Sequence, residues 1–159
     1  MPTLRTIGVY DFDRESFLAA LAGAHVELLL DVRQRRGVRG SEYAWANAQR
    51  LQAALTEAGV GYSHLKELAP TTEMRELQYR EDDRRGEGKR SRTVLAPAYV
   101  ERYTEEVLER VDLAPIVSWI GNSAAALLCV ERDPEACHRS LVAERLQREF
   151  GFEVEHLRP

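Results

Sequence analysis

Residues 124–140 have the sequence AAALLCVERDPEACHRS, in which an apolar run is followed by a turn and then by a helical pattern. The run Ala124–Val130 is continuously apolar, which predicts a strand covered on both faces, as in a parallel sheet. The turn signal Asp133-Pro134 ends the run, and the helical pattern continues to Phe150-Gly151. Because ligands of open α/β sheets bind beyond the carboxyl ends of the strands, we expect the functional site just after this run.

Four other segments have the character of short strands, and helical patterns lie between them. The predicted strands are Thr6–Tyr10, Val26–Val32, Gly61–Leu65 and Glu153–Leu157. The predicted helices follow Asp13, cover the region of Ala44–Ala58, follow Pro97, and cover Pro115–Ile120. This Rossmann-like alternation predicts a single three-layer α/β domain over residues 1–159, with a mostly parallel sheet of about five strands. The apolar runs Val26–Val32 and Ala124–Val130 should be interior, parallel strands.

One long segment shows neither the helical nor the strand spacing of apolar residues. Residues 66–95 contain few apolar side chains and show no strand or helix pattern. We therefore expect a long, partly mobile loop there. Loops of this length in compact domains are usually functional or disordered.

The composition is that of a globular protein without membrane spans. The chain has 159 residues, of which 44% are hydrophobic and 30% charged, and no apolar run approaches the roughly 20 residues that cross a bilayer. Its start, Met1–Arg5, lacks the apolar core of a signal peptide, so we expect a cytoplasmic protein with two reduced cysteines and no membrane partner. The net charge of −4 argues against bulk attraction to polyanions. The basic residues cluster in two segments: Arg33, Arg35, Arg36 and Arg39, and Arg80, Arg84, Arg85, Lys89, Arg90 and Arg92.

The turn after Val130 allows two arrangements. If the helix begins at the Asp133-Pro134 signal, Cys137 and His138 lie at the end of its first turn. If that signal belongs to a separate turn, the main helix opens at Cys137 instead. Its free N–H groups and its dipole would then favour an anion beside Arg139 and Ser140, and would lower the pKa of the Cys137 thiol.

The candidate site residues follow two of the predicted strands. Thiols and imidazoles serve as nucleophiles and acid–base groups, and a carboxylate orients them. The catalytic candidates are Cys137, His138 and Glu131. The guanidinium fork suits a carboxylate or a phosphate. The ligand-binding candidates are Asp31, Arg33, Arg139 and Ser140. Because both segments leave their strands at the carboxyl ends, we expect these side chains to converge on one crevice.

Each candidate also has a purely structural interpretation. His138 can be a satisfied structural histidine, and Arg139 can pair with Glu131 rather than hold a ligand. Cys129 lies in an apolar strand, where free cysteines are usually small core residues. The spacing Cys-x7-Cys-His matches no zinc framework, so we expect no metal site. The arginine clusters can be solvated faces.

The segment Leu127–Ser140 resembles the Leu-x-Cys-x-Glu…Cys-His-Arg-Ser segment of a bacterial and archaeal family named domain of unknown function 488. The resemblance extends over nearly the whole chain, through segments similar in order and spacing: Thr6-Ile7-Gly8, Asp31-Val32-Arg33, Ala58–Tyr62 and Val154–Leu157. The chain resembles a divergent member, since it departs from the family pattern at Val9-Tyr10, Gln34–Gly37 and Leu68–Pro70. The resemblance implies the fold and the place of the site, and it implies no reaction.

Two functional hypotheses follow. In the first, the protein binds a small anionic ligand, a nucleotide or phosphorylated metabolite, at the Cys-His-Arg-Ser turn and acts on it by thiol or acid–base catalysis. In the second, it is a non-catalytic nucleic-acid-binding or adaptor domain whose arginine-rich loops contact phosphates. The sequence assigns no cofactor, no substrate and no oligomeric state.

Overall fold

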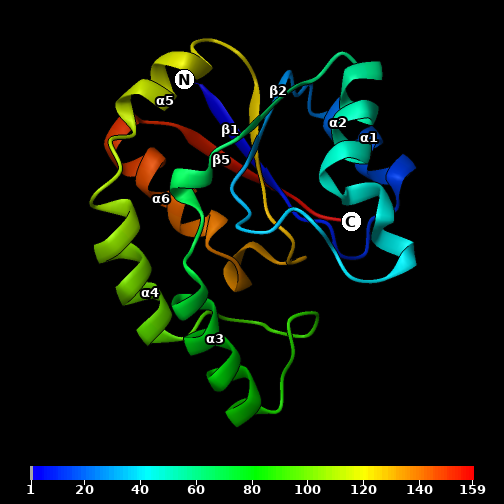
Figure 1. Cartoon of the computed structure of the whole chain (residues 1–159). Helices are drawn as coiled ribbons and strands as arrows, with labels where there is room; N and C mark the ends of the chain where they lie inside the picture. Colours follow the sequence, from blue (N-terminus) through cyan, green and yellow to red (C-terminus); the bar gives the residue numbers. More distant parts are fainter. Residues whose placement is uncertain (1) are drawn as a thin grey trace.

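The computed structural model describes residues 2–159 as a five-stranded sheet with helices on both faces (Figure 1). The strands are β1 (Thr3–Ile7), β2 (Leu28–Asp31), β3 (Gly61–His64), β4 (Ala125–Leu128) and β5 (Glu153–Leu157). They lie in the order β3-β2-β4-β1-β5, and every neighbouring pair is parallel. The α/β prediction is therefore confirmed, and the two most apolar runs form the interior strands β2 and β4. All five carboxyl ends face the same edge of the sheet.

Residues 2–159 form six α-helices, five of which cover the two faces of the sheet, with a separate hydrophobic core beneath each face. They are α1 (Arg14–Gly23), α2 (Ala48–Glu57), α3 (Thr72–Arg85), α4 (Pro97–Tyr103), α5 (Ala114–Ile120) and α6 (Arg139–Phe150). Shorter segments are the 3₁₀ turns η1 (Ser41–Ala46), η2 (Lys66–Leu68) and η4 (Pro134–Ala136), and the π-helical turn η3 (Thr104–Leu108). α1 and α2 pack on one face, and α4, α5 and α6 pack on the other (Figure 1). No helix among residues 2–159 is long and apolar enough to cross a membrane.

The long loop predicted over residues 66–95 is wrong over α3. The buried side chains of this helix are Met74, Gln78 and Asp82, which are four residues apart and so share one face. Two of the three are polar, which is why no apolar period marks the helix. Thr71 caps its start, because its side chain accepts a hydrogen bond from the backbone N–H of Met74.

The turn after β4 adopts the second of the two predicted arrangements. η4 is a separate turn, and α6 begins at Arg139 with His138 as its N-cap. The helix thus starts two residues beyond Cys137, and Cys137 itself has an extended backbone, with φ −141° and ψ 146°. Cys137 and His138 therefore lie in the link between the two: the Cys137 N–H donates to the carbonyl oxygen of Pro134 in η4, and the His138 carbonyl oxygen accepts the first hydrogen bonds of α6.

Gly8 allows the loop after β1 to touch the loop after β4. A Cβ atom on Gly8 would lie 2.0 Å from the carbonyl oxygen of Glu131, which is far inside van der Waals contact. We expect Gly8→Ala to destabilise the protein by about 1–3 kcal/mol through this overpacking, measured by urea unfolding. Gly23→Ala is the matched control, since no atom lies within 4 Å of its Cβ position, and it should stabilise α1 by about 0.5–1 kcal/mol. An unchanged unfolding midpoint for Gly8→Ala would contradict the close approach.

Candidate functional site

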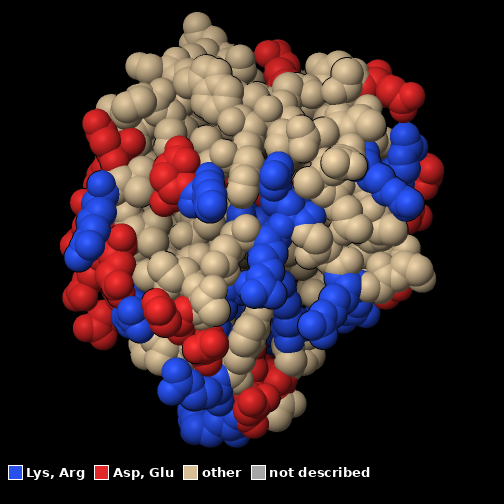
Figure 2. All heavy atoms as spheres, viewed as in Figure 1, with Lys and Arg blue, Asp and Glu red and all other residues tan. Residues whose placement is uncertain are grey.

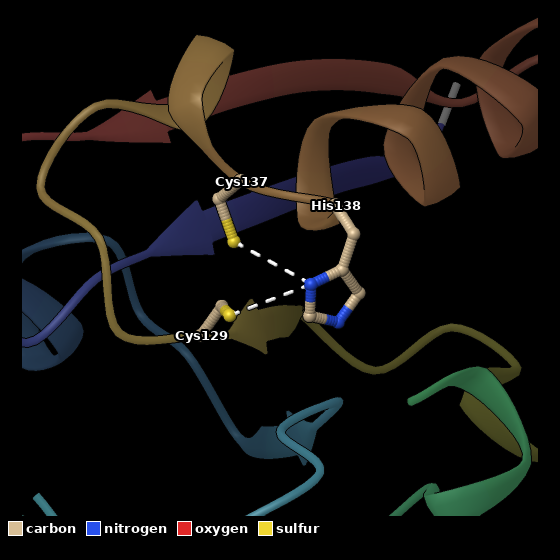
Figure 3. A group of neighbouring side chains, drawn as sticks. All are labelled: Cys129, Cys137 and His138. Atoms are coloured by element: carbon tan, nitrogen blue, oxygen red, sulfur yellow. Dashed lines mark hydrogen bonds between the residues drawn. The ribbon is translucent and has the colours of Figure 1, made fainter. Parts of the chain in front are cut away.

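Two thiols and one imidazole meet at the carboxyl edge of the sheet (Figure 3). Cys129 is the first residue after β4, and Cys137 and His138 immediately precede α6. Nδ1 of His138 lies 3.6 Å from Sγ of Cys129 and 3.8 Å from Sγ of Cys137. All three side chains are buried. The fold therefore gives one imidazole nitrogen two thiol neighbours.

The orientation of the His138 ring is set by its other nitrogen. Nε2 lies 2.7 Å from the backbone carbonyl oxygen of Val32, just after β2. A carbonyl oxygen only accepts, so Nε2 donates its hydrogen there, and in the neutral ring Nδ1 carries the free lone pair. Tyr103 packs against the ring edge-on, with 5.3 Å between the ring centroids. This histidine is thus held in the tautomer that accepts a proton from a thiol.

The same surroundings act oppositely on the two thiols. Burial raises the pKa of Cys137, but the Cys129 thiol and the charges of His138 and Arg139 lower it by a larger amount. The net pKa therefore lies well below its ordinary value. Burial raises the pKa of Cys129 well above its ordinary value, and the neighbouring Cys137 raises it more. Burial lowers the pKa of His138, yet Cys137 more than offsets this and the net pKa is raised. Cys137 and His138 therefore favour a thiolate–imidazolium pair.

Glu131 belongs to a buried ionic network beside the thiols. Its carboxylate accepts from Sγ of Cys129 at 3.4 Å and from the guanidinium of Arg92 at 3.2 Å. Arg92 also donates to the buried carboxylate of Asp82, at 2.7 Å. Burial and the nearby Cys137 raise the pKa of Glu131, and Lys89 and Arg92 oppose that shift. This carboxylate is close to the cluster, as predicted, and contacts Cys129 rather than His138.

Asp31 and Arg33 form a buried, bidentate ion pair. Arg33 donates to the two carboxylate oxygens of Asp31 at 2.9 and 2.8 Å, and a third bond reaches the carbonyl oxygen of Ala46 at 2.9 Å. Tyr62 donates its hydroxyl to the same carboxylate. These bonds engage the predicted ligand-binding pair within the fold, and they fix the end of β2 whose Val32 carbonyl orients His138.

Arg139 and Ser140 also bond inward. The guanidinium of Arg139 is fully buried and donates to the carbonyl oxygens of Glu131 at 2.7 Å and Arg132 at 3.1 Å. Ser140 donates its hydroxyl to the carbonyl oxygen of Cys137 at 2.8 Å. Neither Arg139 nor Ser140 lines the cavity described below. The expectation that Arg33 and Arg139 clamp one anion together is therefore corrected: each arginine secures a different loop at the sheet edge.

A cavity of about 660 Å³ opens above the Cys–His cluster, between the loop after β2, α3 and the loop that precedes α4. Cys129, Cys137 and His138 line its floor. Its walls carry one carboxylate, that of Glu131, and many cationic groups. The cationic lining residues are Arg33, Arg35, Arg39, Arg75, Lys89, Arg90 and Arg92. In Figure 2, Lys and Arg side chains form a band near the centre of the viewed face.

Three of these cationic side chains make no direct polar contact. Within residues 2–159, neither an ion pair nor a hydrogen bond engages the side chains of Arg35, Arg39 or Lys89, although Lys89 is near enough to lower the pKa of Glu131. Arg75 bonds only to the neutral groups of Gln34 and Tyr79. The cavity therefore has a surplus of positive charge above a thiol floor, an arrangement that attracts anions.

The three floor residues also offer a metal-ligand set. Their donor atoms lie within 4.8 Å of one another, and two thiolates with an imidazole nitrogen are donors that zinc prefers. The sequence spacing gave no reason to expect this convergence, which depends on the fold bringing the β4 end to the α6 start. The positive charges of Arg92 and Arg139 act on Cys137 and are unfavourable for a divalent cation beside it.

Sequence reasoning missed two members of the site, Cys129 and Arg92. Cys129 has the sequence character of a core residue, although Glu131, two positions on, indicates that the same side of the extended chain is polar. Arg92 lies in a segment so rich in charges that nothing distinguishes it from its solvated neighbours. Only the fold shows that it is buried between α3 and the turn before α6.

The model of a family described as Domain of unknown function DUF488 matches residues 13–146. No curated protein and no solved structure matches the chain. The matched range contains the whole Cys–His cluster and every residue that lines the cavity except Tyr10. The comparisons therefore establish a family for the site and assign it no reaction.

Proposed function

This chain belongs to the DUF488 family, and we propose that it binds a small anionic molecule, a nucleotide or phosphorylated metabolite, and acts on it with Cys137 as nucleophile. One observation carries the proposal: a thiol–imidazole pair lies at the floor of a cavity whose walls have unpaired cationic groups. Thiol chemistry requires reduced cysteines, which agrees with the expected cytoplasmic location.

The cavity suits a small molecule in size and in charge. Its volume of about 660 Å³ falls within the roughly 300–1,000 Å³ of small-molecule sites. The unpaired side chains of Arg35, Arg39 and Lys89 would hold the anionic groups near its mouth. Tyr10, Tyr79 and Tyr99 give the walls aromatic surface for the uncharged part of the ligand.

The Cys137–His138 pair supports a two-step substitution. The Cys137 thiolate attacks an electrophilic carbon of the bound molecule, an S–C bond forms, and the leaving group departs with the proton of the His138 imidazolium. Nδ1 of the now neutral His138 then accepts a proton from water, whose oxygen attacks the same carbon. The S–C bond breaks, and the thiolate and the imidazolium are restored. Val32 serves as the positioning group through its bond to Nε2.

Anion binding is tested by thermal unfolding in the presence of nucleotides and phosphorylated metabolites. A ligand at a hundred times its Kd stabilises the native state by about 2.7 kcal/mol. We expect such stabilisation for the wild-type protein and its loss in Arg35→Gln/Lys89→Gln. The control Arg110→Gln/Arg148→Gln removes the same charge from exposed positions outside the cavity and should keep the effect.

A different result would replace the proposal. If a short oligonucleotide stabilises the protein, with a steep salt dependence, and no small anion does so, the chain is a nucleic-acid-binding domain. If both double variants retain ligand stabilisation, the anion binds elsewhere on the surface.

A further inference from the structure

The chemistry proposed above leaves one thiol of the cluster unused. Cys129 lies as close to the shared imidazole nitrogen as Cys137 does, at 3.6 Å against 3.8 Å. The two sulfurs are within 4.8 Å of each other. The proposed substitution uses one thiol, Cys137, and one base, His138, so it does not explain the position of Cys129.

The position of each cysteine allows the sulfurs to approach further. Cys129 follows the last residue of β4, and Cys137 lies between η4 and α6 with an extended backbone. A shift of the short segment around η4 would bring the sulfurs to the roughly 2.05 Å of a disulfide bond and leave β4 and α6 intact. Both cysteines are buried but line the floor of the cavity, which gives a small oxidant a route toward their sulfurs.

We infer that the protein reduces small hydroperoxides, with Cys137 as the attacking thiol and Cys129 as the resolving thiol, and forms an intramolecular Cys129–Cys137 disulfide. This activity shares Cys137 with the proposed function and does not require an anionic ligand. It assigns a role to each thiol, and His138 serves both because Nδ1 faces both sulfurs (Figure 3).

The atoms and electrons balance in two steps. The Cys137 thiolate attacks the terminal oxygen of a hydroperoxide, an S–O bond forms, the O–O bond breaks, and the alcohol or water leaves with the proton of the His138 imidazolium. Nδ1 of neutral His138 then takes the proton of the Cys129 thiol, whose sulfur attacks the sulfenic acid at Cys137. The S–S bond forms, the S–O bond breaks, and hydroxide leaves as water with that proton. Two thiols are oxidised, one peroxide is reduced, and an external dithiol restores the reduced protein.

The charges around the two sulfurs favour this division of roles. The cationic groups of His138 and Arg139 lie near Cys137 and stabilise its thiolate. Cys129 instead donates its S–H toward the carboxylate of Glu131, at 3.4 Å, which keeps it protonated until His138 becomes neutral. Cys137 is thus a thiolate that can attack the peroxide, and Cys129 is a thiol that can attack the sulfenic acid in the second step.

The test treats the reduced full chain with equimolar hydrogen peroxide and measures free thiols and intact mass. We expect the wild-type protein to lose both thiols, with a mass decrease of two hydrogen atoms and no dimer. We expect Cys129→Ser to accumulate a sulfenic acid that dimedone traps at Cys137, and Cys137→Ser to remain unmodified. Restoration of both thiols by a dithiol completes the expected result.

Two outcomes would overturn the inference. One is a wild-type protein that proceeds to sulfinic acid at Cys137 without an intramolecular disulfide. The other is equal peroxide consumption by Cys137→Ser and the wild-type protein. Alkylation of Cys137 in the Cys129→Ser variant separates the two proposals, because it reports the nucleophile without the resolving thiol. Rapid alkylation together with either outcome defeats only the peroxide activity, whereas absent alkylation defeats the proposed nucleophile as well.

Discussion

Alkylation of Cys137 by iodoacetamide is expected to remain rapid at pH 7, and His138→Asn is expected to slow it about tenfold at that pH. Burial raises the pKa of Cys137, but the Cys129 thiol and the charges of His138 and Arg139 bring the net pKa well below its ordinary value. A thiol with an unperturbed pKa of about 8.5 is only a few per cent thiolate at pH 7. Removing the imidazolium should raise the pKa of Cys137 toward that of an unperturbed thiol.

The sign of the pH dependence follows from the direction of the shift. The thiolate persists at every pH above the lowered pKa, so the alkylation rate should stay level from pH 9 downward and fall only as the pH passes through that pKa. Mass spectrometry resolves the label at each cysteine, and Cys129, whose pKa is raised by burial, serves as the internal control. Rates that already decline between pH 9 and pH 8 in the wild-type protein would show that Cys137 has an ordinary pKa.

Asp31→Ala is expected to lower the free energy of unfolding by about 3–5 kcal/mol, because it leaves the Arg33 guanidinium buried without its carboxylate. The side chains of this ion pair are 0% and 1% exposed, and no solvent replaces the lost partner. The Tyr62 hydroxyl loses its acceptor as well. Chemical denaturation by urea, with an unchanged slope, measures the loss.

Two comparisons test whether burial of the charge is the cause. Glu106→Gln removes a carboxylate from the solvent-exposed pair with Arg102, whose side chains are 37% and 39% exposed, and should shift the urea midpoint far less than Asp31→Ala does. The double variant Asp31→Leu/Arg33→Met removes both charges and should recover much of the stability lost in Asp31→Ala. Equal destabilisation by the single and the double variant would show that packing, and not the unpaired charge, determines the effect.

The interior strands could be predicted from the sequence because burial on both faces demands apolar residues at every position. Val26–Val32 and Ala124–Val130 meet that demand, and they contain β2 and β4. The observed strands are shorter than the apolar runs, since β2 spans Leu28–Asp31 and β4 spans Ala125–Leu128, although Cys129 still donates its backbone N–H to the carbonyl oxygen of Ile7. The helix α3 could not be predicted in this way, since Gln78 and Asp82 on its buried face are polar.

The sequence predicted candidate site residues after β2 and β4, but it could not predict the roles of their arginines. The carboxyl ends of parallel strands meet at one edge, and this brings Cys129 after β4 and the carbonyl of Val32 after β2 to His138. Which arginine is buried and which faces the cavity depends on partners far away in sequence. Arg92 is buried because the carboxylates of Asp82 and Glu131 accept hydrogen bonds from its guanidinium group, whereas Arg35 has an exposed side chain at the cavity mouth.

The most direct test of a thiolate beneath a cationic cavity compares anionic iodoacetate with neutral iodoacetamide at Cys137. Each rate is measured at low salt in the folded protein and in the urea-unfolded chain, and the preference for iodoacetate is the ratio of the two rates. We expect the folded protein to show a preference at least about tenfold higher than the unfolded chain, since electrostatic steering raises rates by roughly 10–10³. The preference should fall with added salt and in Arg35→Gln/Lys89→Gln. A folded-state preference equal to or below that of the unfolded chain would contradict the proposed anion-binding thiol site.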